Sequence, residues 1–289
     1  MKSVNMEKLW TIKVLFYSIL VGLTFTSCQE VVNPIPSFQP DGERKVLMEE
    51  ISGANCAPCA DAAQELANLQ ALYGENLVIV TMHTFLATPQ ARPSAGATYD
   101  FRTIDGTEIL DFIGVPIGIP IGSVNRELFE NEPDLLLNKT QWAGFIAQEI
   151  TRPPEVGLNI TSDLEVINRV VNIDVTVVPN QDISGDVRLT VLFTEDNITD
   201  KQLSSAGVID DFKHSHIMRS LITPFDGQSL GTDLVNGKAI TKSFRVSIPT
   251  ADEGGPWDIS QLNIVAYASL NDFDKGVKRV LQADEVKVQ

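Results

Sequence analysis

The sequence feature that most restricts what this chain can fold into is one Cys-x-x-Cys segment, Cys56-Ala57-Pro58-Cys59. The chain has three cysteines, and Cys28 falls in an export signal, so the mature protein keeps only this pair. A fold stapled by disulfides normally needs more cysteines than two. An apolar run from Val46 to Ile51 precedes the pair, and a helical pattern follows it. This order is typical of a redox site, in which a helix N-terminus lowers the pKa of a thiolate.

Residues 1–28 have the pattern of a signal peptide. Lysines give a positive start, Val14 to Phe25 form an apolar core, and small residues lead into Cys28. The apolar core is too short for an ordinary membrane span. A cysteine at the cleavage point resembles a bacterial lipobox, so we predict that Cys28 is lipidated and anchors the mature chain to a membrane. The alternative is an ordinary secretory signal with an incidental cysteine.

Residues 29–43 contain three prolines among polar residues and predict an extended tether. Removal of the signal takes away three lysines and one glutamate, which changes the formal charge from −16 to about −18. An acidic surface of this kind repels phosphate backbones, so nucleic acid is excluded as a partner. We also find no sequence motif of a serine hydrolase, a zinc protease or a nucleotide-binding loop.

Residues 44–152 alternate strand and helix patterns. A helical pattern extends from Pro58 to about Tyr73, and the apolar run Leu77 to Met82 is typical of a strand covered on both faces. A short helix is predicted near Thr107 to Ile113, a strand near Ile119 to Val124, and a closing helix from Lys139 to Thr151. Alternation of this kind predicts an α/β domain with a mixed or parallel sheet.

Residues 153–289 have a different pattern, in which apolar and polar residues alternate over several short segments separated by turn residues. Such segments predict an antiparallel β-sandwich. One connection, Asp196 to Lys238, is long enough to be functional or locally structured.

Cys56 and Cys59 are the predicted catalytic residues. We expect Cys56 at the exposed end of the helix, where it acts as the attacking thiolate, and Cys59 one turn further in as the resolving thiol. Glu50 precedes Cys56 by six residues, late in an apolar strand, and would accept the proton of Cys59. The alternative for Glu50 is a solvated carboxylate at a strand end.

The chain has three histidines, at positions 83, 214 and 216. His83 ends a strand at the edge of the sheet where the cysteine helix begins, so we expect it beside the substrate, polarising the site or stabilising the Cys56 thiolate. A backbone hydrogen bond is the other role for this histidine. His214 and His216 are too few for a zinc site, so no metal and no cofactor are predicted, and hydrogen bonds that order the long connection are expected instead.

The sequence resembles the outer-membrane-protein-28-related lipoproteins of Bacteroidetes over nearly the whole mature chain. Four segments carry the resemblance: Gly53–Cys59, Ile119–Arg126, Phe212–Arg219 and Val280–Ala283. The resemblance implies an α/β thioredoxin-like domain over 44–152 followed by an all-β immunoglobulin-like sandwich over 153–289. It also implies an outer-membrane lipoprotein that faces the periplasm or the cell surface.

The thioredoxin-like resemblance also implies that Pro120 forms a cis peptide bond facing the cysteines, and that Ile119 and Pro120 contact an extended substrate. Pro116 is a rival for this role. The sequence departs from a typical thioredoxin because Asn55 replaces the usual tryptophan and Ile121 replaces a common threonine. The segment Leu86 to Thr103 is predicted to be an insertion that caps the site.

Two functions remain open from the sequence. In the first, the protein exchanges disulfides with envelope proteins that contain thiols or disulfides. In the second, it is a surface binding or adhesion lipoprotein in which Cys56–Cys59 is a structural disulfide and the β domain contacts the partner.

Overall fold

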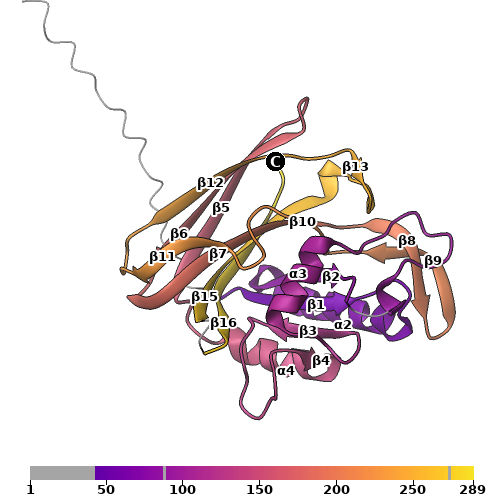
Figure 1. Cartoon of the computed structure of the whole chain (residues 1–289), viewed down its shortest axis with the longest axis horizontal. Helices are drawn as coiled ribbons and strands as arrows, with labels where there is room; N and C mark the ends of the chain where they lie inside the picture. The colour runs from indigo at the N-terminus through magenta and orange to yellow at the C-terminus, as the bar shows by residue number, and fades with distance from the viewer. Residues whose placement is uncertain (1–42, 87–88, 273–274) are drawn as a thin grey trace, which may run out of the picture. The chain divides into compact units, whose positions relative to one another are not determined.

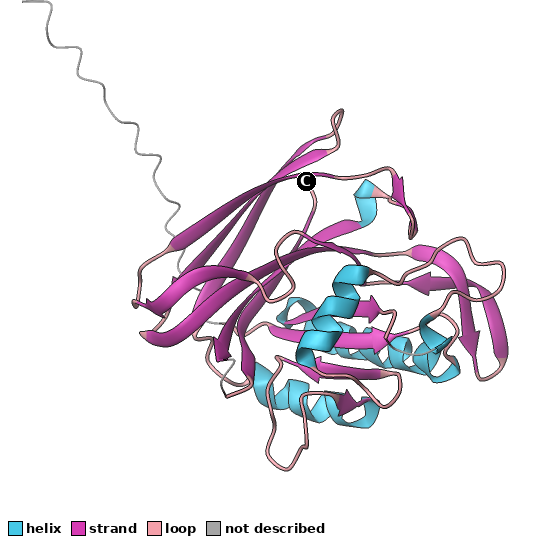
Figure 2. Ribbon diagram, viewed as in Figure 1, coloured by secondary structure: helices cyan, strands magenta, loops and turns pink. Residues whose placement is uncertain are grey.

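The computed structural model describes residues 43–86, 89–272 and 275–289, which form sixteen β-strands and three α-helices (Figures 1 and 2). The predicted signal peptide with Cys28, and the tether apart from Glu43, lie outside the described residues. Within these described ranges, no helix is long and apolar enough to cross a membrane.

A strand–helix–strand unit built of β1 (Val46–Ser52), α2 (Ala57–Tyr73) and β2 (Leu77–His83) carries the cysteine pair. The two strands are parallel and in register, and every residue in them is buried. Complete burial follows from their near-continuous apolar runs, because a parallel strand is covered on both faces. Gly74 ends α2 with a positive φ of 56°, a conformation that favours glycine.

Helices cover both faces of this unit (Figure 1). The apolar side of α2 packs on one face together with Trp142 and Ile146 of α4 (Lys139–Ile150). On the other face, α3 (Ile104–Ile113) contributes Ile109 and Leu110 to a second cluster. The short strands β3 (Ile121–Val124) and β4 (Leu137–Asn138) extend the sheet, with β3 antiparallel to β1.

The remaining strands form the second half of the chain. They are β5 (Val156–Glu165), β6 (Val170–Pro179), β7 (Ile183–Glu195), β8 (Ile198–Ser204), β9 (Gly207–His214), β10 (Ile217–Leu221), β11 (Gln228–Leu234), β12 (Ile240–Ser247), β13 (Ala251–Asp252), β14 (Gly255–Pro256), β15 (Leu262–Asp272) and β16 (Val277–Lys287). Strands β5, β6 and β12 form a three-stranded sheet that packs on one face of β7, β15 and β16.

One nine-stranded sheet contains strands from both halves, in the order β16-β15-β7-β10-β2-β1-β3-β4 with β11 beside β7. The two halves join where Ile217 of β10 pairs with Thr81 of β2. Strands β7 and β15 are buried on both faces, because Leu192, Val265 and Tyr267 pack on the first-half core while their neighbours pack on the second sheet.

The predicted fold class, a thioredoxin-like α/β domain followed by an immunoglobulin-like sandwich, is therefore wrong. The described chain is a mostly β structure whose main sheet is mixed and shared by both halves. The alternating pattern of the second half suggested strands with one solvated face. In the structure, the other face of β7 and β15 is covered by the first half, so these strands belong to a common core.

A buried ionic contact crosses this shared sheet. The Arg126 guanidinium, just after β3, donates to Glu49 Oε1 of β1 at 2.6 Å and to Glu49 Oε2 at 2.8 Å. It also donates to the Tyr267 hydroxyl of β15 at 2.6 Å. The side chains of Arg126 and Glu49 are both 1% exposed. The contact therefore ties strands of the first and second halves together.

Candidate functional site

Cys56 and Cys59 form a disulfide at the start of α2, with their Cα atoms 5.3 Å apart. Cys56 is the N-cap of the helix and Pro58 lies in its first turn, where a missing N–H is tolerated. Cys56 is 1% exposed and Cys59 is 2% exposed. The expectation that Cys56 presents an exposed sulfur is wrong, because neighbouring segments cover the helix end.

A cis peptide bond between Ile119 and Pro120 lies against the disulfide. The Ile119 carbonyl oxygen is 3.8 Å from Cys56 Sγ. A disulfide sulfur has no proton to donate, so this is a contact in the oxidised protein, and a reduced Cys56 thiol would donate to the same oxygen. Ile119–Pro120 is the only cis bond among the residues described, so Pro116 does not take this role.

Two segments cover the disulfide. From the predicted insertion, the Gln90 carbonyl accepts from the Asn55 N–H at 3.1 Å, and the Ser94 hydroxyl donates to the Ala54 carbonyl. From β8, the Gln202 amide donates to the Cys56 carbonyl at 3.0 Å. The fit is tight: a Cβ added at Gly53 would lie 2.3 Å from the Gln90 carbonyl oxygen.

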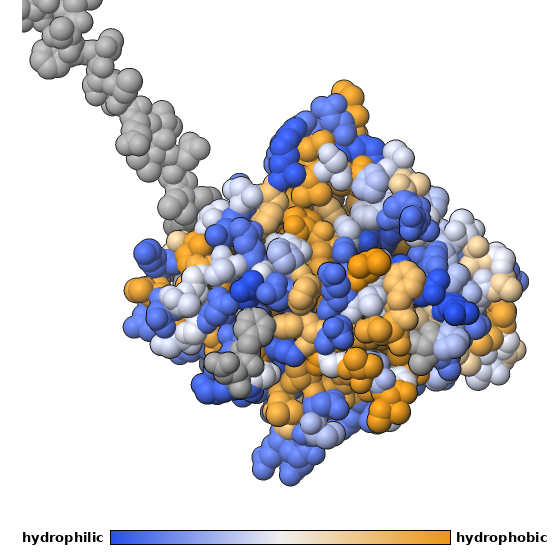
Figure 3. All heavy atoms as spheres, viewed as in Figure 1, coloured by the Kyte–Doolittle hydropathy of each residue, from blue (hydrophilic) through white to orange (hydrophobic). Residues whose placement is uncertain are grey.

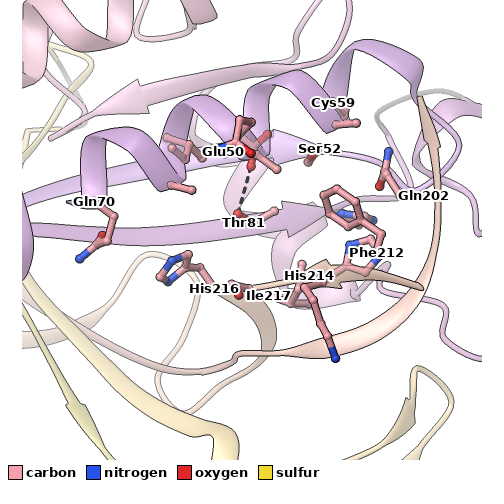
Figure 4. Close-up of a pocket in the computed structure, with 18 of the residues that line it drawn as sticks. Glu50, Ser52, Cys59, Gln70, Thr81, Gln202, Phe212, His214, His216 and Ile217 are labelled. Atoms are coloured by element: carbon pink, nitrogen blue, oxygen red, sulfur yellow. Dashed lines mark hydrogen bonds between the residues drawn. The ribbon is translucent and has the colours of Figure 1, made fainter. Parts of the chain in front are cut away.

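A cavity of about 580 Å³ lies on the other side of the pair, between α2 and the chain that joins β9 to β10 (Figure 4). Its residues come from both halves of the chain. Cys59 lines it beside Glu50, Thr81 and His83 from the strand ends, and Phe212, His214 and His216 form the opposite wall. Cys56 contacts Ile119 while Cys59 lines this cavity, so the two sulfurs have different surroundings.

Glu50 is buried, with 1% of its surface exposed, which contradicts the alternative of a solvated carboxylate. Its Oε2 accepts from the Thr81 hydroxyl at 3.0 Å, and its Oε1 has no hydrogen-bond partner among the described residues. Burial raises the pKa of Glu50 to about 7, although the Thr81 and Ser52 hydroxyls act in the opposite direction. A carboxyl with this pKa exchanges a proton readily near neutral pH, and its role as acceptor of the Cys59 proton stays a prediction.

His83 and His214 are buried imidazoles that stay neutral. Burial lowers the pKa of His83 to about 3 and that of His214 to about 4. A neutral His83 does not stabilise the Cys56 thiolate by charge, so this environment disfavours one of its two predicted roles. Both rings contact Phe101, whose centroid is 5.3 Å from His83 and 4.6 Å from His214. This aromatic contact connects β9 to the predicted insertion.

Replacement of Glu50 by glutamine is expected to remove a pH dependence of stability. Because the folded state raises the pKa of Glu50 from 4.5 to about 7, the protonated carboxyl favours folding below pH ~4.5, and that contribution is lost as the pH rises through about 7. The loss is on the order of 3 kcal/mol. Urea unfolding of the wild type and the variant from pH 5 to 8 measures the difference between their free energies of unfolding. The histidines are the same in both proteins, so their contributions cancel in this difference. Parallel pH profiles for the two proteins would contradict the assignment.

Sequence reasoning missed the contribution of the second half to this site. The sequence predicts that His214 and His216 order the long connection, yet together with Phe212 they form a wall of the cavity that Cys59 also lines. The segment Phe212–His216 groups one aromatic residue and two histidines, and this grouping was the sequence signal for a contribution to the site. No group of three or more His, Cys, Asp or Glu side chains among the residues described is placed to hold a metal ion.

Comparisons with known proteins identify relatives of this chain. The sequence model of the family described as outer membrane protein Omp28 matches residues 112–289. No curated protein matches the sequence. The structure is similar to HBP35 of Porphyromonas gingivalis, with a TM-score of 0.64 and 14% identity over 86% of this chain and 77% of that chain. A protein from Agrobacterium tumefaciens has a TM-score of 0.52 and 12% identity, over 86% of this chain and 96% of that chain. At these identities the likeness to solved structures concerns the fold alone.

Proposed function

We propose that this chain, which belongs to the outer membrane protein Omp28 family, is a lipid-anchored envelope protein whose Cys56–Cys59 pair exchanges disulfides with other envelope proteins; the family match over residues 112–289 supports the envelope location. The anchor would be Cys28, at the end of the predicted signal peptide. The partner supplies a disulfide or a pair of thiols, so no metal or organic cofactor is required.

The contact that carries the exchange proposal is the Ile119 carbonyl 3.8 Å from Cys56 Sγ. The cis bond to Pro120 brings this backbone segment against the sulfur, where an extended partner segment would pass next to Cys56. The loop before the cis bond is apolar and exposed at Val115 and Ile117. Apolar side chains also gather on the face above α3 (Figure 3), and such a surface suits a protein partner.

In the reductive direction, the Cys56 thiolate attacks a partner disulfide, forms a mixed disulfide and releases one partner thiolate. The Cys59 thiol then passes its proton to Glu50 within the shared cavity. The Cys59 thiolate attacks Cys56 Sγ, which restores the Cys56–Cys59 disulfide and releases the second partner thiolate. The partner gains two electrons, and the oxidative direction is the reverse of these steps.

The reduction potential of the pair tests this proposal. We expect a value between about −120 and −270 mV, the range of known oxidoreductases, from alkylation and mass analysis across a glutathione series. A potential below about −300 mV would mark a disulfide that the glutathione pool does not reduce. That result would contradict the exchange proposal.

The burial of both sulfurs favours a second candidate function. With 1% and 2% of Cys56 and Cys59 exposed, the disulfide has the surroundings of a structural staple that closes the first turn of α2. The protein would then be a surface binding lipoprotein, with the partner contacting the β-rich second half. Exchange, by contrast, requires the segment around Gln90 or strand β8 to move away from the helix end.

A further inference from the structure

Five buried side-chain atoms around the cavity between α2 and the β9–β10 connection have no hydrogen-bond partner among the described residues; two belong to the half-buried Gln70 and His216, and three to deeply buried side chains. The latter three are Glu50 Oε1, His83 Nδ1 and His214 Nε2, and their residues are at most 4% exposed. An unsatisfied buried polar atom costs about 1–3 kcal/mol, and native structures contain few of them. Three such atoms around one cavity indicate that the cavity receives a polar ligand.

The unpartnered atoms are suited to accept hydrogen bonds. An ionised Glu50 offers only lone pairs. The His214 ring donates to the backbone at Asp200 and Lys201 through its other nitrogen, so Nε2 of the neutral ring carries a lone pair. His83 is neutral as well and offers a lone pair at Nδ1 in one of its tautomers. The ligand must therefore bring several donors.

The rest of the cavity wall is largely apolar, and its single cation is already engaged. Alanines of α2 and the Phe212 ring supply much of the wall. The Lys213 ammonium donates to the Thr199 hydroxyl. A formal charge of −16 on the whole chain also favours a positive ligand. Since no group of three metal-ligating side chains occurs among the described residues, the cation indicated is organic.

We propose that this cavity binds a primary ammonium or guanidinium group carried on an apolar stem. An ammonium brings three donors and no acceptor; it donates to Glu50 Oε1, and its charge pairs with the Glu50 carboxylate. The stem lies along the alanines of α2. The cation comes either from a free amine or from a lysine or arginine side chain of a partner protein. The proposal goes beyond disulfide exchange, although it uses the Glu50 carboxylate that would accept the Cys59 proton.

The histidines make a direct assay possible, because the chain has three of them and all line this cavity. Oxidised protein labelled with ¹³C in its imidazole rings is titrated at pH 8 with n-butylamine hydrochloride, followed by NMR. The matched neutral probe is 1-butanol. A short peptide with a single lysine is titrated in parallel to distinguish a partner side chain from a free amine. No thiol is present, so the result does not depend on the redox function.

Butylammonium is expected to shift the His83 and His214 signals saturably, whereas 1-butanol leaves them in place. Glu50→Gln should weaken binding at least ~tenfold, since it removes a charged hydrogen bond. Asp61→Asn, on an exposed position of α2 outside the cavity, should bind like the wild type. Ala63→Leu keeps Glu50 but fills the cavity and should abolish the shifts.

Equal shifts with 1-butanol, or an unchanged affinity in Glu50→Gln, would overturn the proposal, as would the absence of saturable shifts. Binding of the lysine peptide with equal or higher affinity than butylammonium assigns the cation to a partner protein. Binding of butylammonium alone assigns it to a free amine. Either assignment supports the site.

Discussion

A Cys59→Ser variant is expected to accumulate mixed disulfides with envelope proteins through Cys56, while the wild-type protein accumulates almost none. Without the resolving thiol, the Cys56–partner bond has no internal thiolate to break it. We propose these roles because Cys56 contacts the Ile119 carbonyl, where a partner segment would pass, whereas Cys59 lines the cavity beside Glu50. Acid quenching of cells, alkylation and non-reducing electrophoresis with mass analysis measure the trapped species.

The double variant Cys56→Ser/Cys59→Ser is the matched control, and it should trap no partner at all. Cys56→Ser alone leaves Cys59, which lines the cavity beside Glu50 and away from the Ile119 segment, so it should trap far less than Cys59→Ser. Equal trapping by the two single variants would contradict the assigned roles. A Cys59→Ser variant without Cys56-dependent partners would support the structural staple.

The local part of the site was predictable from the sequence, since its signals lie within short segments. The run Val46 to Ile51, the Cys-x-x-Cys and the helical pattern after Pro58 predict β1 and the start of α2, and the structure has both. Glu50 was placed beside the pair from its position late in β1. Pro120 came from family resemblance alone, because the cis form is uncommon at most X–Pro bonds.

The shared sheet was not predictable by the same reasoning. The two halves of this sheet meet where Ile217 pairs with Thr81. These residues come from opposite halves of the chain, and no local sequence pattern encodes such a contact. The second face of β7 and β15 is apolar at Leu192 and Val265, but a sandwich strand with a few apolar outward positions has the same sequence pattern. The histidine wall of the cavity depends on this join and was missed with it.

Replacement of Arg126 by methionine is expected to destabilise the protein by about 3–5 kcal/mol, since it leaves the Glu49 carboxylate buried without its cation. Methionine retains most of the buried volume. Position 126 has a left-handed backbone with a φ of 47°. Arginine and methionine both have this backbone conformation there, so it does not account for the difference in stability. Urea unfolding followed by near-ultraviolet circular dichroism at pH 7 measures the change.

The matched control is Arg245→Met, which breaks the ion pair between Arg245 and Glu165. That arginine is 59% exposed, so its loss should reduce stability far less than the loss of Arg126. Adding Glu49→Gln to Arg126→Met removes the stranded charge and should restore part of the lost stability, which a double-mutant cycle expresses as a coupling energy.

The Arg126 result also tests whether the two halves unfold together. Arg126 contacts Glu49 of β1 and Tyr267 of β15, so the broken contact lies where the two halves meet in one sheet. A single sheet with a common core should unfold in one cooperative transition, because neither half keeps its burial when the other leaves. Arg126→Met should therefore shift one transition to lower urea. A separate early transition of either half, or a loss no larger than that of Arg245→Met, would contradict the shared core.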